Sequence, residues 1–158
     1  MPSKQIELLM RMAVEQARIA LGAGDYPIGA ALVVDDEIIL ARNERNTRKD
    51  KKSHAETNAI EIAGDKRDAK EKALLVTLEP CGMCARALME FGIDRLYYIL
   101  DDPVNGAAKS MRGVFIEKVE NPEYLHLMAG WAEDHRKKYP AHYEYIKRIV
   151  MDLPDSHA

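Results

Sequence analysis

One stretch of the chain constrains the fold more than any other, because residues 73–78 read Ala-Leu-Leu-Val-Thr-Leu without a charge. A run of this length with almost no polar interruption predicts a strand covered on both faces, as in the sheets of α/β proteins. Glu79 and Pro80 end the run, and proline is favourable in the first turn of a helix. We therefore expect an α/β fold built around this strand.

The segments before this strand have the patterns of a helix, a hairpin and a second helix. Between residues 6 and 21 the apolar side chains recur every three or four positions, which predicts an amphipathic helix. Two short apolar runs, 29–34 and 37–41, are separated by two aspartates and predict a β-hairpin. Ser53 is suited to cap a further helix that extends to about residue 63, where a glycine follows.

The segments after the strand continue the alternation. We expect a helix over 81–91 and a strand over 95–100, and then a turn-rich segment over 101–113. Residues 114–119 form a fifth strand or an extended edge, and the tail from 123 to 153 has helical spacing. Strand, helix, strand, helix and strand in this order predict a partly parallel sheet with helices on its faces.

Length and composition place the chain among ordinary globular proteins. Its 158 residues suit a single domain, and 47 % apolar with 31 % charged residues is a soluble balance. No run approaches the roughly 20 apolar residues that span a bilayer, and the first twenty residues carry charges instead of an apolar signal block. We expect a cytoplasmic protein without a membrane partner.

The two cysteines of the chain, Cys81 and Cys84, lie three residues apart at a helix start. This spacing puts both sulfurs on one face, and the positive end of the helix favours thiolates, which are zinc ligands. A closed structural zinc site needs four protein ligands, and no second cysteine pair exists. His54 also opens a helix, so convergence of the two helix starts would give three ligands and one open position for water.

Glu56 follows His54 by two residues and has two interpretations. It could move protons for a zinc-activated water, or it could complete a Ser-x-x-Glu capping box with Ser53. A Cys-x-x-Cys pair could also serve redox chemistry, and a catalytically inactive zinc-binding module is a further alternative. The other histidines are expected to be surface or tail residues: His126, His135, His142 and His157.

Taken together, His54-Ala55-Glu56 and Pro80-Cys81-Gly82-Met83-Cys84 resemble the zinc site of the cytidine and deoxycytidylate deaminase superfamily. The chain is most similar to the branch of guanine, cytosine and tRNA adenosine deaminases, over roughly residues 5 to 112. The resemblance implies a three-layer α/β/α fold around a mixed five-stranded sheet, usually in a homodimer. It also implies one zinc ion per subunit, held by His54, Cys81 and Cys84.

The same resemblance implies roles for residues around the metal. Glu56 would carry protons during hydrolytic loss of an exocyclic amino group. Asn43 and the backbone amide of Ala55 would hold the edge of the base, with Ile28 against its face. Asp102 precedes an Asn-Gly-Ala-Ala segment that resembles the family's lining of the substrate entrance.

The distribution of charge bears on the substrate. Residues 42–52 carry six cationic and two acidic side chains, a local charge of +4, against −7 for the remainder of the chain. Such a run is usually a solvated loop, and a tRNA would require a broad positive surface. We therefore favour a small purine or pyrimidine substrate of the guanine or cytosine type, with a tRNA adenosine deaminase as the alternative. The tail from about residue 123 diverges from the family, so the sequence does not identify which base is deaminated.

Overall fold

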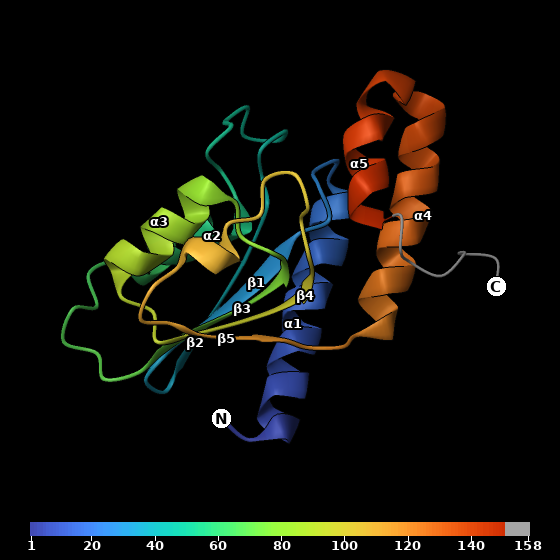
Figure 1. Cartoon of the computed structure of the whole chain (residues 1–158). Coiled ribbons are helices and arrows are strands. Elements are labelled where there is room, and N and C mark those ends of the chain that lie inside the picture. Colours follow the sequence, from blue (N-terminus) through green and yellow to red (C-terminus); the bar gives the residue numbers. More distant parts are fainter. Residues whose placement is uncertain (151–158) are drawn as a thin grey trace.

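The computed structural model describes residues 1–150, which form a mixed five-stranded sheet with helices on both faces (Figure 1). The elements in chain order are α1 (Ser3–Gly22), β1 (Gly29–Val34), β2 (Glu37–Arg42), α2 (Ala55–Ala63), β3 (Lys72–Leu78), α3 (Gly82–Phe91), β4 (Arg95–Leu100), η1 (Ala108–Ser110), β5 (Phe115–Lys118), α4 (Pro122–Lys138), η2 (Pro140–His142) and α5 (Tyr143–Val150). The strand order is β2-β1-β3-β4-β5. β1 is antiparallel to β2 and β3, whereas β3, β4 and β5 are parallel. The predicted α/β fold class is confirmed.

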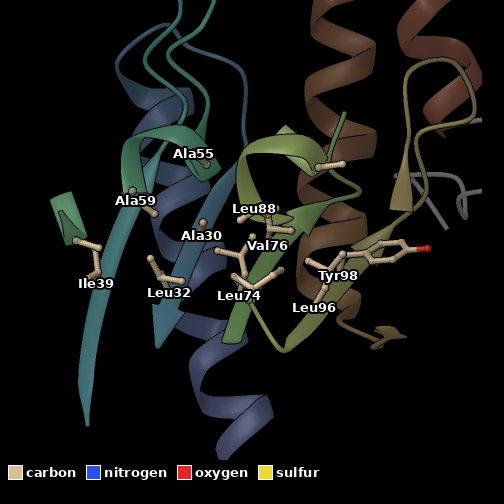
Figure 2. Close-up of a cluster of buried hydrophobic side chains, with 14 of the residues drawn as sticks. Ala30, Leu32, Ile39, Ala55, Ala59, Leu74, Val76, Leu88, Leu96 and Tyr98 are labelled. Carbon is tan, nitrogen blue, oxygen red and sulfur yellow. The ribbon is translucent and has the colours of Figure 1, made fainter. Parts of the chain in front are cut away.

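The sheet separates two apolar layers, and β3 at its centre contributes to both. All seven residues of β3 are buried, as the charge-free run predicts. Leu74 and Val76 belong to the cluster on the face that α2 and α3 cover, and Figure 2 shows them beside Leu88, with Ala55 and Ala59 farther along the same face. The alternate positions of β3 pack on the opposite face against α1, α4 and α5. The result is a three-layer α/β/α arrangement.

Helix α1 packs unusually close to the sheet because Gly29, at the start of β1, has no side chain. A Cβ atom there would lie 2.0 Å from the carbonyl oxygen of Ala13 and 2.6 Å from the amide nitrogen of Ala17. Both alanines are completely buried, so small residues meet at the contact from both sides. The close approach holds the middle of α1 against the start of β1.

The tail folds into two helices that return over the sheet. Asn121 accepts a hydrogen bond from the amide of Tyr124 (2.9 Å) and so caps α4, and the Tyr124 hydroxyl donates to the carbonyl of Pro27 (2.8 Å). Pro140 follows α4 and separates it from α5. Helical spacing in the tail is confirmed, although its predicted last apolar position, Leu153, lies outside the described residues. Within the described part of the chain, no helix combines the length and apolarity needed to cross a bilayer.

The contact at Gly29 gives a prediction about stability. Gly29→Ala should lower the free energy of unfolding by about 1–3 kcal/mol, because its new methyl group meets helix backbone that cannot rotate away. Gly130→Ala in α4 is the control, since a Cβ there meets nothing within 4 Å. It should raise stability by about 0.5–1 kcal/mol through the better helix propensity of alanine. Urea unfolding of both variants measures the difference, and equal stability of Gly29→Ala and parent would contradict the close packing.

Candidate active site

The first residues of α2 and α3 bring three metal-binding side chains together. His54 is the residue before α2, Cys81 is the residue before α3, and Cys84 lies in the first turn of α3. The Nδ1 atom of His54 lies 3.7 Å from the Cys81 sulfur and 3.4 Å from the Cys84 sulfur. Within the residues that the structure describes, this is the only group of three or more His, Cys, Asp or Glu donors that lie so close.

The geometry of this group fits zinc. Zinc binds cysteine sulfur at about 2.3 Å and histidine nitrogen at about 2.0–2.1 Å, with tetrahedral angles. These values put a nitrogen and a sulfur on one ion about 3.6 Å apart, close to the observed 3.4 and 3.7 Å. The set of one imidazole and two thiolates is also a soft N/S set of the kind that zinc prefers. Three protein donors leave one of four positions free for water or substrate.

The two thiols shift each other's pKa in opposite directions. A hydrogen bond from Cys84 lowers the pKa of Cys81 to about 4, and the same contact, together with burial, raises the pKa of Cys84. A hydrogen bond with Cys81 raises the pKa of His54. Because zinc ligands must be deprotonated, the affinity of this group for zinc depends on pH.

Glu56 lies next to this group without capping its helix. The backbone amide of His54 donates to the Thr57 hydroxyl (3.1 Å), so the residue that closes the helix start is Thr57. The Ser53 hydroxyl instead accepts a hydrogen bond from the side-chain amide of Asn58 (3.0 Å). The alternative interpretation, a capping box of Ser53 with Glu56, is therefore contradicted. The Glu56 side chain is buried, and burial raises its pKa to about 7.

A cavity of about 290 Å³ opens beside His54. Its lining residues are Tyr26, Pro27, Ile28, Asn43, Arg45, His54, Leu78, Asn105, Met128, Trp131, Tyr145 and Ile149. Two of the expected substrate contacts, Ile28 and Asn43, are among them. Ala55 and Asp102 are buried and do not line it. Their roles toward a substrate stay predictions.

Asp102 instead organises the segment 102–108, of which Asn105 lines the cavity. Its Oδ1 atom accepts hydrogen bonds from the amides of Val104 and Asn105 (both 3.0 Å), and its Oδ2 atom accepts one from the Tyr145 hydroxyl (2.9 Å). These contacts hold Asn105 in the cavity wall and join the segment to α5. Asp102 thus positions two residues that line the cavity.

Glu79 links the metal ligands to the same segment, a role that the sequence did not suggest. Its Oε1 atom accepts from the amide of Asp102 (3.0 Å), and its Oε2 atom accepts from the amide of Ala108 (3.1 Å). Gly106 lies so close that a Cβ atom would approach the Glu79 carboxylate to 2.4 Å. The position of Glu79 directly before Pro80-Cys81 was the only sign in the sequence that it matters to the site. Only the fold shows what its carboxylate contacts.

Comparison with known proteins agrees with this geometry. A family model for the cytidine and deoxycytidylate deaminase zinc-binding region matches residues 3–100. The chain belongs to this family. The resemblance carried by the His-Ala-Glu and Cys-x-x-Cys motifs is confirmed, and with it a deaminase with one zinc ion per chain.

Among its relatives, the deaminase is 42 % identical over 106 residues to a tRNA-specific adenosine deaminase of Agrobacterium fabrum, covering 64 % of this chain and 69 % of the relative. It is 29 % identical over 133 residues to a cytosine deaminase of Candida albicans, covering 79 % and 87 %. A solved structure from work on tRNA:A34 deaminases superposes with a TM-score of 0.63 at 31 % identity, over 72 % of this chain and 98 % of the other. These relatives act on substrates of different size.

The metal group gives a prediction about composition. Purified protein should contain about one zinc ion per chain, and Cys81→Ala or Cys84→Ala should lose most of it because two donors bind zinc far more weakly than three. His126→Ala is the control, since this exposed histidine of α4 lies outside the group. Elemental analysis of the dialysed proteins measures the content. Full zinc occupancy in both cysteine variants would show that the ligands are other residues.

Proposed function

We propose that this protein is a zinc-dependent hydrolytic deaminase of small-molecule purines or pyrimidines. The observation that carries the proposal is the cavity beside His54, which α4 and α5 cover. Its volume of about 290 Å³ is just below the roughly 300–1,000 Å³ typical of small-molecule sites. A homodimer, expected from the family, is part of the proposal.

The cover consists of apolar and aromatic side chains that are fixed to the body of the protein. Met128 and Trp131 of α4 and Tyr145 and Ile149 of α5 line the cavity together with Ile28. The Tyr145 hydroxyl bonds to Asp102, and Tyr124 at the start of α4 bonds to the Pro27 carbonyl. A planar base would be enclosed by these rings, whereas the nucleotides that flank a target base in RNA would have to pass the helices.

The side chains around the metal group supply the remaining chemistry. Bound zinc would supply water acidic enough to act as a nucleophile at neutral pH. The Glu56 carboxylate would accept a proton from the attacking water and pass protons to the ring nitrogen and the departing amino group, which leaves as ammonia. The amide of Ala55, at the first position of α2, and the side chain of Asn43 would hold the edge of the base.

A tRNA substrate is the second candidate, because named relatives are tRNA-specific adenosine deaminases. The basic segment 42–52 offers limited support for it. Arg48 lies 3.3 Å from the Asn58 side-chain oxygen and 3.9 Å from Glu61, and Lys52 pairs with Asp50 at 3.2 Å. Part of the local positive charge is therefore already compensated within the protein.

Replacement of the proposed proton carrier tests the mechanism. Glu56→Gln should lower kcat about 100- to 10,000-fold, because an amide cannot exchange protons with water and substrate. Zinc content and thermal stability should stay near parental values, since Glu56 does not cap α2. Glu61→Gln, at an exposed position of the same helix, is the matched control and should keep full activity. A Glu56→Gln rate within tenfold of the parent would exclude this role.

A comparison of substrates tests the proposal that the substrate is a small molecule. The zinc-loaded protein should release ammonia from at least one free base, nucleoside or mononucleotide faster than it forms inosine in a transcribed tRNA anticodon arm. The physical reason is the enclosure of the cavity by α4 and α5. Ammonia release and inosine content are measured on the same preparation. Inosine in the tRNA with no ammonia from any monomer would favour the tRNA candidate instead.

A further inference from the structure

A second cavity adjoins the first and shares an aromatic pair with it. It has a volume of about 500 Å³ and is lined by Leu21, Gly24, Asp25, Tyr26, Arg45, Asn46, Trp131, Asp134, His135, Lys138 and Tyr139. Three of these residues, Tyr26, Arg45 and Trp131, also line the cavity beside His54. The rings of Tyr26 and Trp131 meet edge to face with centroids 5.9 Å apart. Both rings therefore belong to a wall that the two cavities share.

Arg45 is the cation that lines both cavities. Its guanidinium lies 5.8 Å from the centroid of the Tyr26 ring, a distance typical of a cation–π contact. Its Nη1 atom is 3.5 Å from the side-chain oxygen of Asn46, which is a neutral group. No carboxylate oxygen in the described part of the chain lies within 4.0 Å of it, whereas Arg48 and Lys52 on the same segment each have an acidic neighbour. Its donors remain largely available to an anionic ligand.

The backbone around Arg45 is held in place from both sides. Its amide donates to the side-chain oxygen of Asn43 (3.0 Å), which lines the cavity beside His54. Asp25 accepts from the amides of Asn46 (2.8 Å) and Thr47 (2.9 Å) and from the Thr47 hydroxyl (2.8 Å). Asp25 is buried, and both of its oxygens are engaged by the segment. It therefore fixes the loop and does not neutralise Arg45.

The two cavities together match a ligand with a planar part and an anionic part. The cavity beside His54 is lined mainly by apolar and aromatic groups, with Asn43 and Asn105 as neutral polar contacts. The second cavity adds Lys138 to Arg45, and its exposed acidic residue, Asp134, faces solvent. Arginine forms strong charge-assisted hydrogen bonds with phosphate oxygens. A free base would leave this arginine without a ligand.

We propose that the substrate is a nucleoside 5′-monophosphate, with its base beside His54 and its phosphate on Arg45. This assignment rests on the proposed deamination of small molecules and narrows its substrate class. Arg45 then selects the phosphorylated form over the nucleoside. Tyr26 and Trp131 line both cavities, and the guanidinium lies over the Tyr26 ring.

Matched substrates test the assignment. Ammonia release is measured for the base, nucleoside and 5′-monophosphate of cytosine, adenine and guanine. For the base that reacts, kcat/KM of the monophosphate should exceed that of the nucleoside about 10- to 100-fold at low salt, as expected for charged hydrogen bonds. Arg45→Gln should bring this ratio close to one. Lys49→Gln, which removes the same charge from an exposed position of the same segment, is the control and should keep the parental ratio.

A binding measurement separates recognition from turnover. The same monophosphate is titrated calorimetrically into zinc-loaded Glu56→Gln protein, with and without Arg45→Gln, and Kd should rise about 10- to 100-fold in the double variant. A nucleoside that reacts as well as its monophosphate, or an Arg45→Gln variant with the parental ratio and Kd, would overturn the assignment while the proposed function stands. Absence of ammonia from every monomer would overturn the proposed function instead.

Discussion

The site depends on one geometric constraint, which is that two helices begin at the same edge of the sheet. β2 and β3 run in the same direction because each is antiparallel to β1 between them. Their carboxyl ends therefore lie at one edge, and the segments that leave them lead into α2 and α3. Both helices cover the same face of the sheet. This topology is what brings His54 within 3.4 and 3.7 Å of two cysteines about thirty residues away.

Most of the fold and the metal ligands could be predicted because their signals are local. Three signals each specify an element without reference to the rest of the chain. They are the charge-free run of β3, the pair of aspartates between β1 and β2, and the glycines after the helices. The capping box was different. Ser53 with Glu56 and His54 with Thr57 have the same three-residue spacing, so sequence alone cannot choose between them. The fold decides, because Ser53 is buried against Asn58 and only His54 is left at the helix start.

The cover of the cavity could not be predicted, because it depends on contacts between distant parts of the chain. Tyr124 reaches Pro27 across 97 positions, and Tyr145 reaches Asp102 across 43. The apolar spacing of the tail identified a buried face of α5 but gave no information about its partner. Pro140 was a visible signal for the break between α4 and α5, yet not for the direction in which α5 returns. The position of Arg45 at the cavity could not be predicted for a similar reason. In the sequence it is one of six cationic residues of the segment 42–52.

The distribution of these contacts along the chain explains why family membership determines the chemistry better than the substrate. The family match ends at residue 100, and it includes the three metal-binding side chains and Glu56. Four residues that cover the cavity, Met128, Trp131, Tyr145 and Ile149, all lie beyond it. A relative can therefore share the metal group in full and still enclose a different space above it. For this reason, the tRNA substrates in the names of relatives bear on the reaction more directly than on the ligand that this cavity accepts.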